Sequence, residues 1–281
     1  MKIIEQNIFG LKAFTGIPQN ILSTGVECFL ELRGKPDYKI HRLLPKGTSE
    51  ILFNLGNIFY GKNGVAADKV SNGITCRRYL ISGIKTSYLD SFAVDYFHCL
   101  AVRFKINGIK KLFDISPAEL TDSDYELDCV ISKNSVRNLY EKLSVCETTS
   151  ERFSLLENWL LKKMFNSKDY NRPEPVVNII LSKPMLTVKL LERETGFSRQ
   201  YLHKKFKDAT GLSIKKYQKI KRMTEVLNFL RCNPKKLTQA AYLHGYFDQS
   251  HFIKDFKNIT GLAPALYSEA AFPGTLDPYI F

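Results

Sequence analysis

The sequence has little of what a metal site or a redox centre needs. Its 281 residues include six cysteines and five histidines, with no Cys-x-x-Cys, His-x-His or His-x-x-x-His pair among them. Zinc sites and dithiol centres depend on such close spacing. We therefore expect no metal and no cofactor, and we interpret the cysteines as small buried thiols in a reducing cytoplasm. They are Cys28, Cys76, Cys99, Cys129, Cys146 and Cys232.

Catalytic signatures and long apolar runs are missing as well. The chain contains no Gly-x-Ser-x-Gly turn, phosphate-cradling loop or dinucleotide fingerprint, so we expect that it is not an enzyme. The chain has no run of 18 consecutive apolar residues, the length that a membrane-spanning helix needs. Residues 1–7 include an acidic residue, Glu5, where a secretory signal would be basic and then apolar. These features predict a cytoplasmic protein with no membrane partner. With 44% hydrophobic and 25% charged residues, the chain is typical of globular proteins and long enough for two domains.

Positive charge is abundant and unevenly distributed. The formal net charge is +13, and residues 176–270 hold 17 Lys and Arg against 7 Asp and Glu, a net of +10. A surface that binds nucleic-acid phosphates requires such a concentration of cations. A basic face that only keeps the protein in solution would not predict it.

One sequence pattern occurs twice within this basic segment. Phe-Lys-x-x-Thr-Gly-Leu stands at residues 206–212 and again at residues 256–262, with an offset of 50 residues. A repeat with a fixed offset indicates one structural unit used twice.

Each copy carries the signals of two short helices joined by a turn. The second helix of such a helix-turn-helix has the right width to enter the DNA major groove. The predicted helix caps are Thr187, Ser198, Thr238 and Asp248, and the glycines that break or end the helices are Gly196, Gly211, Gly245 and Gly261. A longer linking helix is predicted over residues 213–230, between the two units.

Helical periodicity separates the buried and exposed faces of the two second helices. Apolar side chains at helical spacing should point inward, namely Leu202, Phe206, Ala209, Phe252, Phe256 and Ile259. The opposite faces are rich in groups that read base edges, since Gln suits adenine, Lys suits guanine and Ile suits a thymine methyl group. The predicted base-reading residues are Gln200, His203, Lys204, Gln249, Ser250, Ile253 and Lys254. The predicted contacts to the DNA backbone are Arg199, Lys207, Lys215, Lys216, Lys219 and Lys257.

Residues 241–267 read A-x-x-x-G-Y-F-D-Q-S-H-F-x-x-x-F-K-x-x-x-G-x-x-P-x-x-Y, and this segment resembles the second motif of the AraC/XylS family of bacterial transcription regulators. The resemblance covers about the last hundred residues. It implies an all-α domain in which a linking helix holds two helix-turn-helix motifs, each offering one helix to adjacent segments of the major groove. The chain departs from the family pattern at Glu192, where a small Ala is usual, and at Ser268, where Arg is common.

The first half of the chain alternates in the manner of β-strands. Five strands are predicted, over residues 28–32, 39–44, 50–55, 77–81 and 98–104, separated by Gly, Pro, Asn or Asp. The predicted turns include residues 34–36, 45–47, 61–64, 72–73 and 107–108. An antiparallel barrel or sandwich of about 110 residues follows from this pattern.

Helices are predicted after the strands. Ser116, Pro117 and Glu119 have the order of a capping box with proline at the first helical position. Two longer helices are predicted over residues 135–145 and 150–165. The second carries an apolar stripe that includes Phe153 and Leu160, which could dock on the barrel or pair with the same stripe in a second subunit.

The strand-rich half also resembles the N-terminal region of one group of AraC-type regulators, through residues 41–47 and 50–56. That region has no assigned ligand. In the wider family an N-terminal β-barrel binds a small effector or mediates dimerisation, so the resemblance implies one of these two roles.

The sequence therefore predicts an α+β protein of two domains. An antiparallel β-barrel or sandwich with trailing helices occupies residues 1–165 and binds an effector, mediates dimerisation, or both. A linker spans residues 166–175, an AraC-type DNA-binding domain with two helix-turn-helix motifs spans residues 176–270, and a tail spans residues 271–281.

The predicted function is sequence-specific regulation of transcription, controlled by a small molecule or by dimerisation. Its partners would be double-stranded DNA, an unidentified effector, a second copy of the chain, and RNA polymerase if the protein is an activator. Two alternatives remain, an architectural protein indifferent to DNA sequence and a metabolite-processing enzyme fused to a DNA-binding domain.

Overall fold

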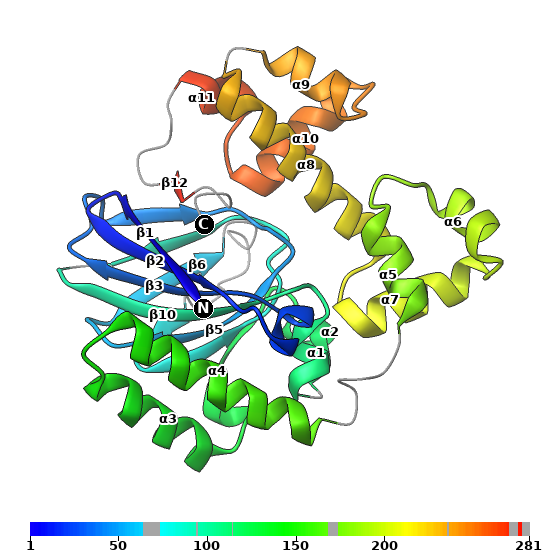
Figure 1. The fold of residues 1–281 in the computed structure, drawn as a ribbon. Helices are drawn as coiled ribbons and strands as arrows, with labels where there is room; N and C mark the ends of the chain where they lie inside the picture. Colours follow the sequence, from blue (N-terminus) through cyan, green and yellow to red (C-terminus); the bar gives the residue numbers. More distant parts are fainter. Residues whose placement is uncertain are drawn as a thin grey trace.

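The computed structural model describes residues 1–63, 74–93, 95–113, 115–167, 174–234, 236–269 and 275–276. Figure 1 shows a β-rich body with the helices α3 (Lys133–Val145) and α4 (Thr149–Asn166) along one side; away from that side, the long helix α8 (Ile214–Cys232) joins the helices of the C-terminal half. The turn expected at residues 72–73, most of the expected linker and nearly all of the expected tail lie outside the described residues.

Two sheets form the β-rich body, as predicted. The larger sheet has the order β1 (Lys2–Ile8), β2 (Leu11–Ile17), β3 (Val26–Gly34), β10 (Phe97–Phe104), β5 (Ser49–Asn54), β8 (Tyr79–Ser82) and β11 (Asp124–Glu126). The smaller has the order β12 (Thr275–Leu276), β4 (Ile40–Leu43), β9 (Leu89–Phe92), β6 (Phe59–Asn63) and β7 (Ile74–Cys76). Among the described strands, the pairs are antiparallel except β12 with β4.

The five predicted strands correspond to β3, β4, β5, β8 and β10, and the prediction missed others. Gly61, Lys62 and Asn63 were expected in a turn, but they lie in β6, which pairs with β9. The backbone hydrogen bonds from β9 outweigh the low strand preference of Gly and Asn. β1 was missed because most of its residues are exposed, so its sequence lacks the alternation of a half-buried strand.

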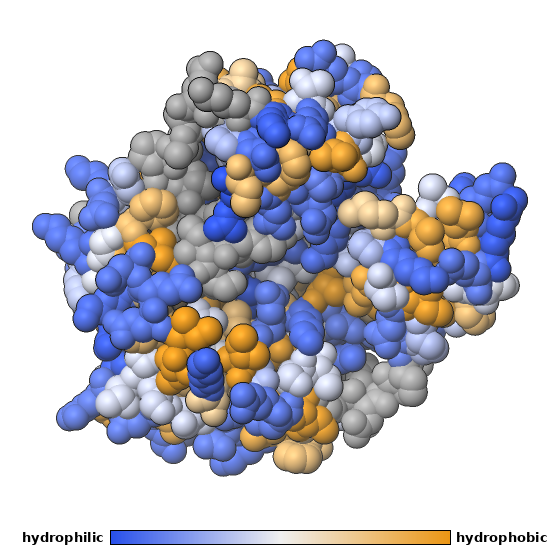
Figure 2. All heavy atoms as spheres, turned by 45° about the horizontal axis from the view of Figure 1, so that its top comes forward, coloured by the Kyte–Doolittle hydropathy of each residue, from blue (hydrophilic) through white to orange (hydrophobic). Residues whose placement is uncertain are grey.

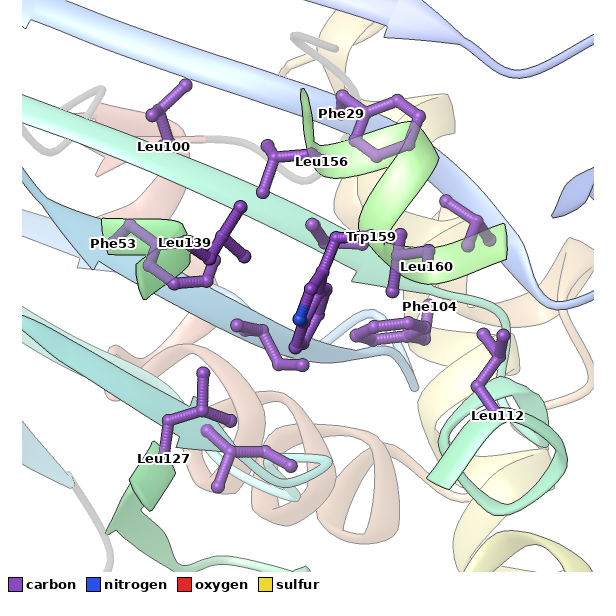
Figure 3. Close-up of a cluster of buried hydrophobic side chains, with 14 of the residues drawn as sticks. Phe29, Phe53, Leu100, Phe104, Leu112, Leu127, Leu139, Leu156, Trp159 and Leu160 are labelled. Atoms are coloured by element: carbon purple, nitrogen blue, oxygen red, sulfur yellow. The ribbon is translucent and has the colours of Figure 1, made fainter. Parts of the chain in front are cut away.

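The outer face of the larger sheet packs against two long helices, α3 (Lys133–Val145) and α4 (Thr149–Asn166). Leu100 and Phe104 of β10 meet Leu156 and Leu160 of α4 in one buried cluster (Figure 3). The apolar stripe of α4 therefore docks on the sheet, and it is not available to pair with a second subunit.

Short helices complete the N-terminal domain. They are the 3₁₀ turns η1 (Ile21–Thr24) and η3 (Leu127–Cys129) and the helices α1 (Gly108–Phe113) and α2 (Pro117–Leu120). Pro117 begins α2 as predicted, but the Ser116 side chain makes no cap hydrogen bond, so the predicted capping box is wrong. A capping box forms instead at α4, between Thr148 and Glu151.

The inner faces of the two sheets enclose a cavity of about 100 Å³. Leu52 and Ala101 line it from the larger sheet, and Leu43 and Phe59 line it from the smaller one. Buried and half-buried apolar side chains therefore separate the sheets. Cys28, Cys76 and Cys99 are buried as expected, whereas Cys129 and Cys232 are exposed and Cys146 is half-buried, which corrects the expectation for those three.

The described part of the C-terminal domain contains seven helices. They are α5 (Pro175–Ser182), α6 (Val188–Thr195), α7 (Arg199–Thr210), α8 (Ile214–Cys232), α9 (Leu237–Leu243), α10 (Gln249–Thr260) and α11 (Pro264–Glu269). One core packs around the first half of α8 and includes Ile84 of the N-terminal domain. A second packs around its other half and includes Leu44. None of the helices in the described residues is long and apolar enough to cross a bilayer.

A buried carboxylate ties α4 to the larger sheet. Glu31 of β3 is fully buried, and its Oε1 lies 2.7 Å from His98 Nε2 and 3.1 Å from Arg152 Nη1 of α4. Burial alone would raise the pKa of Glu31, but the hydrogen bond from His98 and the charge of Arg152 outweigh it, so the pKa lies below its ordinary value.

We expect Glu31→Gln to lower the free energy of unfolding by about 3 to 5 kcal/mol, because it leaves the buried Arg152 without its counter-charge. Urea unfolding followed by circular dichroism measures the loss. The control is Glu141→Gln, whose partner Arg137 is exposed, and which should cost less than about 0.5 kcal/mol.

Because the folded state lowers the pKa of Glu31, the contribution of this carboxylate to stability should be complete at neutral pH and fade as the pH falls through that lowered pKa. Equal losses in the two variants would contradict the account.

Phe256 is fully buried in the second core of the C-terminal domain. We expect Phe256→Ala to cost about 3 to 5 kcal/mol of stability through the cavity that it leaves. The free energy of unfolding is measured on the protein without DNA, because the loss of a DNA contact would leave that free energy unchanged. The control is Phe165→Ala, since Phe165 is 78% exposed and its loss should change stability by less than about 0.5 kcal/mol.

Candidate nucleic-acid interface

The first helix-turn-helix, formed by α6 and α7, has the predicted caps. Thr187 Oγ1 accepts a hydrogen bond from Leu190 N–H, and Ser198 Oγ accepts one from Tyr201 N–H. Glu192, which departs from the family pattern, ties the two helices together because its Oε1 accepts the Arg199 N–H at 2.8 Å. The acidic side chain thus satisfies a backbone donor at the start of α7.

The second helix-turn-helix, formed by α9 and α10, differs from the prediction at one cap. Asp248 Oδ1 accepts the Ser250 N–H at 2.9 Å, as expected for the cap of α10. The predicted cap Thr238 is wrong, because α9 begins at Leu237 and its first residue is preceded by Lys236, which makes no side-chain cap. Leu237 packs partly buried against the second core, and the helix begins two residues before the start that a cap at Thr238 predicts.

The two second helices bury one face and expose the other. The six apolar side chains predicted to point inward, three in α7 and three in α10, are all less than 9% exposed. Gln200, Lys204, Gln249, Ser250, Ile253 and Lys254 are exposed, and His203 is half-buried. The seven side chains predicted to read base edges, three on α7 and four on α10, are therefore all exposed or half-buried, unlike the apolar side chains of the same helices.

The side chains predicted to contact the DNA backbone flank these faces. Those that are exposed are Arg199, Lys207, Lys215, Lys216 and Lys257. Lys219 is half-buried, and its Nζ lies 2.6 Å from Asp255 Oδ1. In Figure 2 hydrophilic side chains cover most of the two helical lobes, and the apolar ones form small separate patches.

Asp255 anchors α10 to α8, and sequence reasoning did not identify it. It is 6% exposed and contacts Lys219 of α8, His251 at 3.2 Å and the Tyr246 hydroxyl at 3.5 Å. Arg222 of α8 lies over the Tyr246 ring, 5.3 Å from its centre. A signal was present, because Asp255 stands at the position that Lys205 occupies in the first copy of the repeat.

The N-terminal domain contacts both units at equivalent points of the repeat, where α7 and α10 end. Gly211 and Gly261 follow the two helices with φ of +78° and +79°, the left-handed conformation that favours glycine. A Cβ at Gly211 would lie 2.5 Å from Pro117 O, and a Cβ at Gly261 would lie 2.5 Å from the Tyr88 ring. Both helix ends are thus in close contact with the β-rich body.

Hydrogen bonds reinforce these two contacts. Thr121 Oγ1 donates to Gly211 O at 3.3 Å, and Arg42 Nη1 donates to Thr260 O at 3.2 Å. Asp90 holds the Arg42 guanidinium through two bonds of 2.7 and 2.8 Å. No sequence signal pointed to these residues, because Arg42 and Thr260 are 218 positions apart.

Metal chemistry has no support in the described residues. Across the ranges that the structure describes, no three His, Cys, Asp or Glu side chains are grouped so that they could hold a metal ion. What the C-terminal domain offers is paired helix faces with exposed amide, hydroxyl and ammonium groups.

Two family models match the chain. A model described as a helix-turn-helix domain matches residues 191–270, and a model described as a domain of unknown function (DUF6597) matches residues 15–126. The first covers both units except the start of α6, and the second covers most of the β-rich body.

Curated relatives match about a third of the chain. Multiple antibiotic resistance protein MarA of Escherichia coli and of Salmonella typhimurium is 30% identical over 87 residues, which are 31% of this chain and 68% of MarA. The F1 operon positive regulatory protein of Yersinia pestis is 28% identical over 92 residues, which are 33% of this chain and 31% of that protein.

A solved structure of a ToxT variant from Vibrio cholerae aligns over 86% of this chain and 97% of ToxT, with a TM-score of 0.44 and 15% identity. The AraC-like transcriptional activator CuxR aligns over 84% of this chain and 86% of CuxR, with a TM-score of 0.33 and 13% identity. The identity and coverage of MarA, together with the helix-turn-helix match, place this chain in the AraC/XylS family of DNA-binding transcription regulators.

Proposed function

We propose that the protein regulates transcription by reading one DNA site with two helices, α7 and α10, in adjacent segments of the major groove. The observation that carries this proposal is that both helices expose a polar, cationic face while one continuous helix, α8, holds their cores. An architectural protein would not need the exposed amide groups of Gln200 and Gln249.

The length of α8 supports engagement of successive grooves. Its 19 residues span about 28 Å at about 1.5 Å per residue. With one helix-turn-helix at each end, the unit approaches the roughly 34 Å of one duplex turn. Any shortfall would be met by bending of the DNA.

The exposed side chains divide into two roles in this proposal. Gln200, His203, Lys204, Gln249, Ser250, Ile253 and Lys254 read base edges, and Arg199, Lys207, Lys215, Lys216 and Lys257 contact phosphates. For Lys219, the ion pair with Asp255 supports a different role, in which it braces α10 against α8.

We propose that residues 1–165 control the DNA-binding domain, residues 176–270, and catalyse no reaction. Control by a small molecule has the better support, because the α4 stripe that suggested dimerisation is buried within the chain. The N-terminal domain hydrogen-bonds to the C-terminal ends of both α7 and α10, so a change in its structure would reach these helices directly. If the protein is an activator, RNA polymerase is a further partner.

We expect Gln249→Ala and Lys254→Ala to weaken binding to the preferred site by about 1 to 3 kcal/mol each and to relax the preference at one base position. The reason is that each side chain would make contacts that the wrong base cannot offer. Gel-shift titration against specific and random DNA measures both effects. The control is Lys142→Ala on α3, an exposed lysine outside the proposed surface. If both substitutions lower affinity for random and specific DNA equally, the base-reading role is wrong.

Lys207→Ala and Lys257→Ala should weaken binding to all DNA sequences alike. Each phosphate contact releases counterions, so each substitution should reduce the slope of log affinity against log salt by about 0.9. Titrations at four or more salt concentrations provide the slope. An unchanged slope together with altered base preference would assign these lysines to base reading instead.

A further inference from the structure

The junction between the two domains contains a second, larger cavity, of about 360 Å³. Its N-terminal wall is formed by the β4–β5 turn, the β10–α1 turn and α1, and its C-terminal wall by α5 and α8. It is distinct from the cavity between the sheets, and its volume is in the range of ligand pockets.

Lysines dominate the charge of this cavity. Lys46, Lys105 and Lys111 line it from the N-terminal domain, Lys221 lines it from α8, and Glu27 is the one acidic residue among the lining side chains that the structure describes. Within the described residues, Lys105, Lys111 and Lys221 form no ion pair with a carboxylate of the protein. The ammonium groups of Lys105, Lys111 and Lys221 carry like charges, and an anion between them would reduce their mutual repulsion.

The other lining groups suit a polar anion. Burial raises the pKa of Tyr217 to about 12, so its phenol stays neutral and adds no negative charge. Burial is the main cause that lowers the pKa of Lys46 to about 8, with the charge of Arg103 acting in the same direction and the carboxylates of Glu50 and Glu27 acting against it. Asn178 and Thr48 add side chains able to donate hydrogen bonds.

We propose that the junction cavity binds a small anion with two or more negative charges on oxygen, held by Lys105 and Lys111 on one side and Lys221 on the other. The excess of cations over Glu27 sets the charge of the ligand. Lysines bind such oxygens as point charges, so phosphate esters and polycarboxylates share the chemistry that this cavity recognises.

The ligand would contact both domains at once and thereby regulate DNA binding. Lys221 lies on α8, which holds both helix-turn-helix units. The turn that contains Gly47 is close to the same helix, because a Cβ added at Gly47 would lie 3.9 Å from Ile220 Cγ2. An anion bridging these elements would favour one arrangement of the domains over others. This step rests on the proposed function, since linkage then requires DNA and anion to change each other's affinity by the same factor.

The test uses the full-length protein, with inorganic pyrophosphate and citrate as separate probes in isothermal titration calorimetry. We expect one pyrophosphate site per chain, weakened about tenfold or more by Lys105→Gln and by Lys221→Gln, because each removes a charge-assisted contact. Lys221→Arg should retain most of the affinity. Lys142→Gln and Lys189→Gln, which alter exposed lysines outside the cavity, should change it less than twofold. Comparing the probes shows whether phosphate or carboxylate groups are preferred.

Two results would overturn the site. One is no binding of either probe to a protein that still melts cooperatively and binds its DNA. The other is binding that Lys257→Gln abolishes and Lys105→Gln leaves intact, which would place the anion on the DNA-binding face.

The regulatory step has its own readout. DNA affinity measured with and without saturating pyrophosphate should differ several-fold in the wild type and not in Lys221→Gln. Anion binding in the cavity without any change in DNA affinity would support the site and overturn its coupling to DNA. Loss of the anion site alone would leave the proposed function standing, because specific DNA binding is measured without the anion.

Discussion

The separation of α7 and α10 depends on α8. Apolar side chains along this helix enter both cores of the C-terminal domain, so each helix-turn-helix packs on a different part of one rigid element. The buried Asp255 adds a polar tie, because its carboxylate contacts Lys219 of α8. A rod fixed at both ends sets the spacing at which the polar faces of α7 and α10 can meet a duplex.

The β-rich body contacts the same unit at both ends of its repeat. Gly211 and Gly261 occupy the same position in the two copies of the repeat. A Cβ added at Gly211 would clash with the Pro117 carbonyl oxygen, and one added at Gly261 would clash with the Tyr88 ring. Arg42 is placed for this contact by Asp90 and by the Tyr88 ring, whose centre is 4.1 Å from the guanidinium carbon. The N-terminal domain therefore contacts the ends of both α7 and α10, and the lysine-lined cavity lies at the same junction.

Features that depend on local physics could be predicted from the sequence. Ser198 and Asp248 cap their helices because a short polar side chain reaches the backbone within its own turn. The repeat with its 50-residue offset led to both helix-turn-helix units, and helical spacing gave the buried faces of α7 and α10. The two-layered β-rich body followed from strand-like segments separated by turn residues.

Features that depend on distant partners could not be predicted in this way. β6 forms because β9 pairs with it, and the same residues in isolation resemble a turn. Thr238 is not a cap because Leu237 packs against a core assembled from other helices. The tie between Arg42 and Thr260 and the gathering of lysines at the junction require the fold itself, since their members come from both domains.

The proposed function requires α7 and α10 to enter successive major-groove segments on one face of the DNA. Methylation interference on a selected binding site tests it most directly, because it reports major-groove contacts at single guanines. We expect two clusters of interfering positions about 10 base pairs apart, with Lys254→Ala affecting one cluster and Lys204→Ala the other. A single cluster, or two clusters on opposite faces of the duplex, would contradict it.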